Sequence, residues 1–399
     1  MAKVGLLINS LSNGGAERVV SRLSHILSAD NEIFLILYDD ANISYDYRGE
    51  LINMGIKPSD RNLLKKALLP FRRSRALKKI KQEKGLDICI SFMASPNIVN
   101  LLGRTPGCKT AISIRNFTGL ELADSFVGKI KGLISRLLYA KADVIIPVSR
   151  EIRQDIITRY HLDPQKVITI YNPYDIESIT RQKQEPLPRD HAAFMEAGPC
   201  VISVGRNMHQ KGFWHLLKAF SLAKQEIPEL RLVIVGRNEL PEQMDRLLDS
   251  LQLRDSVLLP GFQKNPFAYI ERAKVYVLSS LFEGFPNSLA EAMACRKPVI
   301  AANCRSGPKE ILSLDYEKYT RVTDVCPADF GILVPEMGQE ENWDGSVTEP
   351  CDRILARAIA DLIAHPDIQE KYAEKALQRA QDFTFKACGQ QYQAIIDQK

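Results

Sequence analysis

The chain has 399 residues, 45% of them hydrophobic and 25% charged, and a formal net charge of +5. This composition excludes the disordered and fibrous classes, and the length predicts about two or three domains, with two as the default. No uninterrupted apolar run reaches the length of a spanning helix, and the first apolar stretch is too short for a signal peptide. We therefore expect a cytoplasmic protein whose contact with a membrane is at most peripheral.

Runs rich in Val and Ile alternate with helical segments in two successive sets. The first set begins at positions 4, 33, 87, 110, 143 and 167, and the second at 200, 231, 257, 274, 298 and 331. Short, near-continuous apolar strands separated by helices are typical of parallel sheets covered on both faces. The sequence predicts an α/β protein with two doubly wound Rossmann-like domains, at 1–180 and 195–380, joined by the polar linker 181–191.

The positive charge lies in the first half of the chain. Residues 1–178 carry 26 basic and 18 acidic side chains, or +8, and the remainder carries 27 and 30, or −3. Residues 57–85 alone hold 11 Lys or Arg, interleaved with Leu, Ile and Phe. This pattern suits a helix on an anionic membrane surface, the inner face of the plasma membrane, and a solvated helix face explains it equally well. Nucleic acid is a poorer partner, because the glycine and aromatic pattern of RNA-binding modules is missing.

Eight cysteines are scattered along the chain without a CxxC pair or a neighbouring histidine cluster. Several lie in apolar runs, such as "DICIS" and "CVISV". We expect reduced thiols that are mostly buried.

Ligands of doubly wound sheets bind at the carboxyl ends of the strands. After the first predicted strand, Gly14 and Gly15 permit a tight turn and leave backbone amides at a helix start, where anions bind. A simple strand-to-helix turn explains them as well. After the seventh predicted strand, Arg206 and Lys211 lie in one loop, where both side chains could converge on a diphosphate. Ordinary surface charge is the alternative for this pair.

The segment "EGFPNSLAEA", residues 283–292, places two glutamates around a predicted helix start. Glu283 lies in the loop before the helix. Glu291 lies on its second turn, about 6 Å beyond Asn287, where a carboxylate can accept hydrogen bonds from both hydroxyls of a ribose. The residues that can present an anion cradle surround the helix start: Gly284, Phe285, Asn287 and Ser288. A capping pattern with exposed acids is the alternative, but it leaves the upstream cations unexplained.

Three segments together, "VGRNMHQKGF", "EGFPNSLAEAMAC" and "KPVIAANCRSGPKEIL", resemble the large retaining glycosyltransferase family four, also called group 1, of the GT-B fold. The most recognisable feature is the spacing of Glu283 and Glu291, and the amino-terminal "GGAERV" also fits. The resemblance covers nearly the whole chain and is strongest from about 200 to 335. It implies two domains facing across a cleft, with acceptor bound by the first and donor by the second, and a helix within 381–399 that packs back on the first.

The same resemblance implies a role for each candidate residue. Glu283, Arg206 and Lys211 form the catalytic set, because the cations neutralise the donor diphosphate and Glu283 contacts the transferred sugar. Glu291 holds the ribose, and the turn Gly14–Gly15 closes over the donor. The reaction implied is hexose transfer from a UDP-sugar with retention, by front-face attack. No metal or other cofactor is expected, in agreement with the lack of an Asp-x-Asp pair in the sequence.

The sequence departs from the family pattern in two places. Many members have a histidine after a strand of the first domain, near the reacting sugar, whereas this chain has Arg115 and Asn116. We place the acceptor region at these two residues. The residue after "EAMAC" is usually glycine but here is Arg296, which costs up to about 1 kcal/mol if it keeps a left-handed conformation.

The combination of "NGGAERV" and "SGPKEIL" is similar to bacterial enzymes that transfer N-acetylgalactosamine or a related hexose from a UDP donor to an undecaprenyl-linked or growing saccharide. We therefore expect a hexosyltransferase of surface polysaccharide or lipopolysaccharide assembly. Two alternatives stay open. A UDP-hexosamine epimerase would form product from the donor alone, and a catalytically silent nucleotide-sugar- or lipid-binding protein would turn nothing over.

Overall fold

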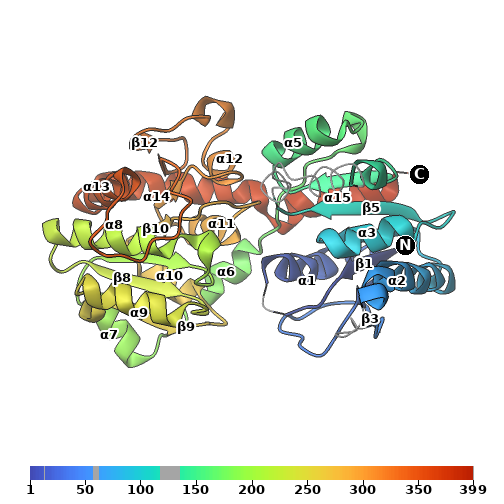
Figure 1. The fold of residues 1–399 in the computed structure, drawn as a ribbon, viewed down its shortest axis with the longest axis horizontal. Coiled ribbons are helices and arrows are strands. Elements are labelled where there is room, and N and C mark those ends of the chain that lie inside the picture. Colours follow the sequence, from blue (N-terminus) through green and yellow to red (C-terminus); the bar gives the residue numbers. More distant parts are fainter. Residues whose placement is uncertain (13, 57–62, 117–134, 399) are drawn as a thin grey trace. The chain divides into compact units, whose positions relative to one another are not determined.

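The computed structural model describes residues 1–12, 14–56, 63–116 and 135–398, and it divides into two compact units (Figure 1). The first unit comprises Met1–Tyr174 and Phe383–Lys399, and the second comprises Asp175–Asp382. The chain therefore leaves the first unit at Tyr174, ahead of the linker expected at 181–191. It returns to that unit at Phe383, close to the start of the terminal segment expected at 381–399.

The first unit is built on a six-stranded parallel sheet with the strand order β3-β2-β1-β4-β5-β6. Its strands are β1 (Ala2–Ile8), β2 (Asn31–Leu37), β3 (Glu50–Asn53), β4 (Ile88–Phe92), β5 (Lys109–Ile114) and β6 (Val144–Pro147). The doubly wound fold is thereby confirmed for this unit. The sequence did not predict β3, because this short edge strand has no fully buried residue to give it an apolar pattern.

The strand predicted at position 167 is wrong. Val167 forms only an isolated bridge with Ile145 of β6, although the amide of Ile168 donates to the Ile145 carbonyl at 2.9 Å and that of Ile170 to the Pro147 carbonyl at 3.1 Å. The segment is apolar because Val167 and Ile170 are buried beside the edge strand. The apolar pattern of this segment therefore resembles that of a strand, but its pairing with β6 is too short to form one.

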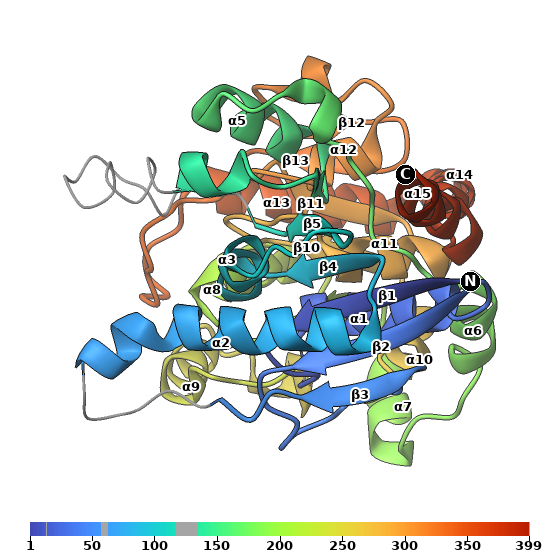
Figure 2. The ribbon, with the colours of Figure 1, turned by 90° about the vertical axis from the view of Figure 1, so that its right-hand side faces the viewer.

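The described residues of this unit include the helices α1 (Gly15–Leu27), α2 (Leu63–Lys84), α3 (Ala94–Leu102), α5 (Arg150–Tyr160) and α15 (Phe385–Asp397). Figure 2 shows α2 running beside the strands of the sheet, and α2 packs against α3. Val20 and Leu23 of α1 share one buried apolar cluster with Tyr392 and Ile395 of α15 and with the inner strands. The last helix of the chain is therefore part of the first unit's core (Figure 1).

The second unit contains a seven-stranded sheet with the order β12-β13-β11-β10-β7-β8-β9, in which only the pairing of β12 with β13 is antiparallel. Its strands are β7 (Cys200–Val204), β8 (Arg231–Val235), β9 (Val257–Gly261), β10 (Val275–Leu278), β11 (Val299–Ala302), β12 (Cys326–Pro327) and β13 (Ile332–Val334). The second doubly wound domain is thereby confirmed as well.

Nine α-helices of the second unit surround that sheet: α6 (Ile176–Gln182), α7 (Arg189–Glu196), α8 (Phe213–Glu226), α9 (Pro241–Ser250), α10 (Phe267–Arg272), α11 (Asn287–Ala294), α12 (Pro308–Leu312), α13 (Pro350–Ala364) and α14 (Pro366–Ala380). The helices α8 and α13 pack closely against each other. Phe213, Leu217 and Phe220 of α8 lie in one apolar cluster with Leu355 and Ile359 of α13. This core holds the start of α8, and with it the loop that follows β7.

All eight cysteines are free thiols, and all but the half-buried Cys326 are buried, as the sequence predicted. Burial raises the pKa of the Cys200 thiol, and likewise that of Cys388, to about 12. These thiols therefore stay protonated and unreactive at neutral pH. Among the described residues, no helix combines the length and the apolar character that crossing a membrane requires.

Candidate functional site

The loop after β7 presents the two cations that the sequence singled out. Arg206 is half-exposed and lies 3.7 Å from the carboxylate of Glu239. Lys211 is mostly buried, and its Nζ lies 2.6 Å from Oε1 of Glu283. Both cations belong to one loop at the carboxyl edge of the sheet, as expected.

The turn that carries Lys211 is fixed by a glycine. A short 3-10 helix, His209–Lys211, ends at Gly212, which has a φ of 57°. A Cβ at Gly212 would lie 2.6 Å from the carbonyl oxygen of Ser279, so only glycine fits there. The Ser279 hydroxyl donates to the Lys211 carbonyl at 2.9 Å. The end of β10 therefore holds the backbone of Lys211 in place.

Glu283 is the centre of a small polar cluster. Its Oε1 accepts hydrogen bonds from Lys211 Nζ at 2.6 Å and from the Ser280 hydroxyl at 2.8 Å. Its Oε2 accepts a longer bond of 3.4 Å from the amide of Gln210, which also donates to the Phe282 carbonyl at 2.9 Å. The structure therefore brings together Lys211 and Glu283 from two loops. The sequence analysis did not identify Ser280 or Gln210 as site residues. Their nearness in the sequence to Glu283 and Lys211 was the signal that could have identified them.

The loop after β11 braces the loop of Glu283. The amide of Glu283 donates to the Arg305 carbonyl at 2.8 Å, and the amide of Ser306 donates back to the Glu283 carbonyl at 2.7 Å. The Ser306 hydroxyl lies 3.1 Å from the carbonyl of Gly284. Gly307 has a φ of 98°, and a Cβ there would lie 2.8 Å from Pro286. The segment "RSGP" therefore shapes the approach to α11, a role that the sequence alone did not reveal.

The helix α11 begins at Asn287, with Pro286 at its N-cap position. Phe285 is buried, at 5% exposure, beside the start of the helix. Glu291 lies one turn further on and is 2% exposed. Ser288 lies at the boundary of the core, and its hydroxyl accepts a hydrogen bond of 2.7 Å from Tyr276 of β10. The backbone at the start of α11 and the carboxylate of Glu291 thus belong to the same helix.

The remaining candidate residues belong to the first unit. Gly14 is the N-cap of α1 in an extended conformation, and the carboxylate of Glu17 lies next to it. Gly15 is the first residue of that helix. Arg115 follows the end of β5, and Asn116 next to it is exposed.

Arg115 is buried in the first unit and has no acid as a hydrogen-bond partner among the described residues. Its Nη2 donates to the side-chain carbonyl of Asn172, and its Nη1 has no hydrogen-bond partner. Burial lowers the pKa of the Arg115 guanidinium, against the opposing effects of Tyr392, Tyr174 and Glu17.

The structure separates the cations of the basic segment 57–85 into buried and exposed ones; residues 57–62 lie outside the described part. Arg73 is buried, stacks on the ring of Tyr38 at 3.7 Å, and donates to the Ile56 carbonyl. Lys81 is buried as well and donates to Asn100 Oδ1 at 2.8 Å. These two cations hold α2 in the fold, so they are not available to an external surface.

Four other cations of α2 are exposed: Arg72, Arg75, Lys78 and Lys79. Near them, Leu68 and Phe71 are 55% and 52% exposed. The described part of α2 therefore has an exposed face that is both basic and apolar. Leu77, on the opposite side, is fully buried in the apolar cluster beneath the helix.

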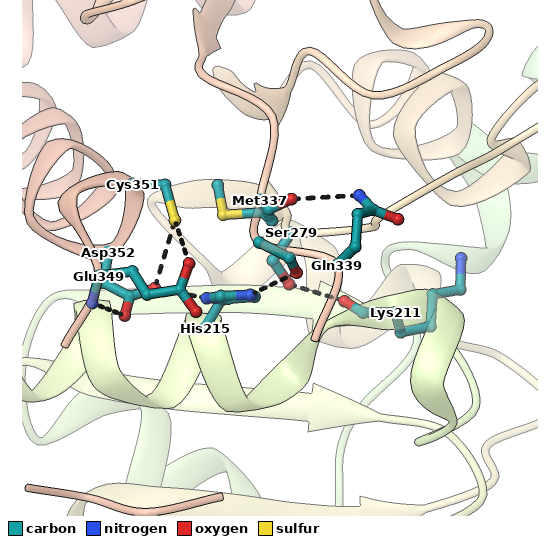
Figure 3. A network of polar contacts seen from close by, with 9 residues as sticks. Lys211, His215, Ser279, Met337, Gln339, Glu349, Cys351 and Asp352 are labelled. Carbon is teal, nitrogen blue, oxygen red and sulfur yellow. Dashed lines mark hydrogen bonds and ion pairs between the residues drawn. The ribbon is translucent and has the colours of Figure 1, made fainter. Parts of the chain in front are cut away.

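Behind the turn of Lys211, a second polar network joins α8 to α13 (Figure 3). His215 of α8 is fully buried, and its Nδ1 lies 2.6 Å from Oδ1 of Asp352, while its Nε2 lies 3.0 Å from the Gly338 carbonyl. The amide of Glu349 donates to the other oxygen of Asp352 at 2.8 Å in a capping box at the start of α13. The Sγ of Cys351 lies within 3.9 Å of both carboxylates.

His215 is held in its charged form by this network. Burial lowers the pKa of His215, but the hydrogen bonds with Asp352 and Cys351 and the charge of Asp352 outweigh it and raise the pKa to about 10. The ion pair fixes the segment before α13 against the start of α8 (Figure 3). This ion pair could not be predicted from the sequence, because His215 and Asp352 lie 137 residues apart.

Family models match the two halves of the chain. The model described as glycosyl transferases group 1 matches residues 188–322, and the model described as glycosyltransferase family 4 matches residues 13–178. The first match contains the cluster of Lys211 and Glu283 and the start of α11. The second contains the turn at Gly14 and the residues Arg115 and Asn116.

Relatives and solved structures agree with these matches. The chain is 31% identical over 388 residues, covering 96% of both chains, to the N-acetylgalactosamine-N,N'-diacetylbacillosaminyl-diphospho-undecaprenol 4-alpha-N-acetylgalactosaminyltransferase of Campylobacter jejuni. It is 22% identical over 402 residues, covering 99% of this chain and 98% of the relative, to a second alpha-1,4-N-acetyl-D-galactosaminyltransferase of that organism, whose name also includes a PP-undecaprenol-linked saccharide. Among solved structures, the fold is similar to that of HepE from Anabaena in complex with UDP-glucose, with a TM-score of 0.74, 17% identity and 99% of each chain covered. The chain belongs to glycosyltransferase family four, the group 1 glycosyltransferases of the GT-B fold.

Proposed function

We propose that this glycosyltransferase transfers a hexose from a UDP-sugar, with retention at the anomeric carbon, to a lipid-linked or growing saccharide. The observation that carries the proposal is the cluster of Lys211, Glu283 and Gln210 beside the loop that leads into α11. It places a cation, a carboxylate and the start of a helix at the carboxyl edge of one parallel sheet, where ligands of such sheets bind.

Each residue of this cluster has a chemical task in the proposed reaction. Lys211 and Arg206 neutralise the charge that develops on the diphosphate as the sugar leaves. The backbone at the start of α11 adds amide donors to the same phosphates. Glu291 accepts hydrogen bonds from the ribose, and Glu283 orients Lys211 and the hexose. The departing phosphate helps to remove the proton of the acceptor hydroxyl.

The proposal also gives a role to the carboxylates that pair with the two cations. Lys211 is paired with Glu283, and Arg206 lies 3.7 Å from Glu239. A diphosphate that reaches the loop offers both cations a stronger acceptor, since phosphates take charge-assisted bonds from Lys and Arg. We therefore expect Arg206 to leave Glu239 when the donor binds. Transfer that proceeds unchanged after exhaustive chelation of divalent ions would support charge neutralisation by these residues, and loss of transfer would count against it.

The donor and acceptor are proposed from the relatives. The name of the Campylobacter jejuni enzyme assigns it N-acetylgalactosamine transfer to a diphospho-undecaprenol-linked saccharide, and the second relative has a similar name. We propose UDP-N-acetylgalactosamine, or a related UDP-hexose, as the donor of this chain. A saccharide on an undecaprenyl diphosphate is the proposed acceptor, with Arg115 and Asn116 in its binding region.

The experiment that tests this function is a two-stage screen. UDP-sugars are first tested for protection against thermal unfolding, because a ligand that binds only the folded state raises the melting temperature. The protecting sugars are then incubated with and without a short-chain polyprenyl-diphosphate saccharide, and products are separated by mass and anomeric configuration. Transfer with retention supports the proposal. Product from the donor alone indicates the epimerase, and binding without any product indicates the silent binding protein.

We further propose that the exposed face of α2 holds the enzyme on an anionic membrane. Its exposed cations attract anionic headgroups, each by about 1 kcal/mol near the surface, and the exposed Leu68 and Phe71 offer apolar contact. A variant with the four exposed cations of α2 changed to Gln should lose binding to vesicles of 30% phosphatidylglycerol. It should keep transfer to a water-soluble acceptor, and unchanged vesicle binding would discard this surface.

A matched control removes the same charge from the second unit. Four exposed cations there can be changed to Gln together: Arg246, Lys264, Lys274 and Lys371. This control should bind the vesicles nearly as well as the parent chain does. An equal loss in both variants would indicate that net charge, and not the face of α2, governs the interaction.

A further inference from the structure

The hydroxyl of Tyr276 is a buried polar group in the middle of the second unit. Tyr276 belongs to β10, an inner strand between β7 and β11, and it is 0% exposed. A phenylalanine would fill nearly the same space without a polar atom. A buried hydroxyl is unfavourable unless it is hydrogen-bonded. The Tyr276 hydroxyl is hydrogen-bonded, because it donates to Oγ of Ser288 at 2.7 Å.

Tyr276 also lies beside the strand that leads into the cation loop. It pairs with Ile202 of β7, which ends at Val204, and the loop of Arg206 and Lys211 begins directly after Val204. Ser288, the partner of the Tyr276 hydroxyl, belongs to the first turn of α11. Tyr276 therefore connects the sheet next to the cation loop with the first turn of α11.

The hydroxyl protons of Tyr276 and Ser288 determine whether Ser288 donates or accepts a hydrogen bond toward each partner. Tyr276 has one hydroxyl proton, and it gives that proton to Ser288. The Ser288 hydroxyl therefore acts as an acceptor toward Tyr276 and keeps its own proton for another partner. Among the described residues, no acceptor takes that proton. Ser288 is 9% exposed, so its side chain lies at the boundary between the core and the surface at the start of α11.

We propose that Tyr276 is a positioning residue that orients the Ser288 hydroxyl as a hydrogen-bond donor to the diphosphate. This inference rests on the proposed function, because it assigns the donor diphosphate to the same place. Ser288 would contact the substrate directly, whereas Tyr276 would act only through Ser288.

The test compares UDP with uridine on the full-length chain. Kd values for both ligands are measured for the parent, for Tyr276→Phe, for Ser288→Ala and for the double variant. The ratio of the uridine Kd to the UDP Kd reports the share of binding that depends on the phosphates. Each single change should lower this ratio about threefold to tenfold, the effect of one hydrogen bond. The double variant should fall no lower than Ser288→Ala, since both changes interrupt one chain of bonds.

Several results would overturn the inference. Tyr276→Phe with the parent's ratio would show that its hydroxyl does not serve the phosphates, and additive losses would show that the two hydroxyls act separately. A purely structural role of Tyr276 would lower the melting temperature but leave the ratio unchanged. If Tyr276→Phe does not fold, Ser288→Thr, which keeps a hydroxyl, should retain the ratio that Ser288→Ala loses, and equal UDP binding by both would refute the proposal. A parent chain that binds no UDP at all would instead refute the proposed function itself.

Discussion

The ion pair of His215 and Asp352 offers a prediction that can be worked out from the structure. Both side chains are 0% exposed, and their nearest atoms lie 2.6 Å apart. A change of His215 to Gln keeps a donor of similar size but leaves the carboxylate of Asp352 buried without its cation. We expect this variant to be strongly destabilised, because an uncompensated buried charge is far less favourable than a buried pair.

The expected size of the effect follows from the burial. Removal of one partner from a buried ion pair costs about 3–5 kcal/mol. The second unit has 208 residues, from 175 to 382 (382 − 175 + 1), and for that size 1 kcal/mol shifts the melting temperature by about 2–4 °C. The melting temperature of the unit should therefore fall by about 6–20 °C. His191→Gln, on a partly buried histidine of the same unit, is the matched control and should have a much smaller effect.

The same pair predicts how stability depends on pH. The pKa of His215 is about 10 in the folded chain, against an ordinary value of 6.5, so the folded form binds more protons between these two values. The stabilisation by His215 is complete below about pH 6.5 and is lost as the pH rises toward 10. Other titratable groups near the pair are Glu349, Cys351 and Lys218. The pH profile is therefore read as the difference in unfolding free energy between the parent and His215→Gln.

The assay is urea unfolding of the second unit at pH 6, 7, 8 and 9, followed by fluorescence of Trp214, which lies in the core beside His215. The difference in unfolding free energy between the parent and His215→Gln should shrink steadily with rising pH. A difference that is constant over this range, or one below about 1 kcal/mol at pH 6, would contradict the assignment of a buried imidazolium.

Further predictions concern single side chains. Lys211→Ala should weaken UDP-sugar binding and turnover together, and normal turnover would remove Lys211 from the site. Glu291→Ala should chiefly raise the KM for the donor while kcat changes little, and the reverse split would refute its ribose role. Lys81→Met should lower the free energy of unfolding by about 1–3 kcal/mol, because the buried Asn100 oxygen loses its donor, and an unchanged urea midpoint would contradict this. Arg296→Gly should stabilise the chain by up to about 1 kcal/mol relative to Arg296→Ala, because the residue has a φ of 61°, and a Gly variant less stable than Ala would refute the strain.

The sequence predicted the elements that have strong local patterns. The buried parallel strands, such as β10 and β11, are apolar along their whole length. Only the brief pairing at Val167 was mistaken for a strand. The left-handed conformation at Arg296 was anticipated from the position where family members place glycine. The edge strand β3 was missed because exposed strands carry little apolar signal.

Contacts between distant residues could not be predicted in the same way. The sequence analysis grouped Arg206, Lys211 and Glu283 because they follow strands of one predicted sheet, and the structure shows that these strands, β7 and β10, are neighbours. It gave no reason to add Ser306 or Tyr276, whose roles depend on hydrogen bonds across loops.

Buried cations are a second limit on prediction from the sequence. Arg73 and His215 are ordinary polar residues in a helical pattern, and only the folded structure shows that they are enclosed. Lys81 lies in the same basic run as the exposed Lys78 and Lys79, and the spacing alone did not separate them. The charge pattern of α2 therefore indicated a basic helix correctly but did not indicate which of its cations face outward.

The central claim is that one diphosphate is held between the cation loop and the start of α11. A crystal structure of the chain with UDP would test it most directly. We predict phosphate oxygens within hydrogen-bond distance of Arg206 and Lys211 and of the first amides of α11, with the ribose hydroxyls on Glu291. Nucleotide density elsewhere on the chain, with Lys211 still paired to Glu283, would contradict the account.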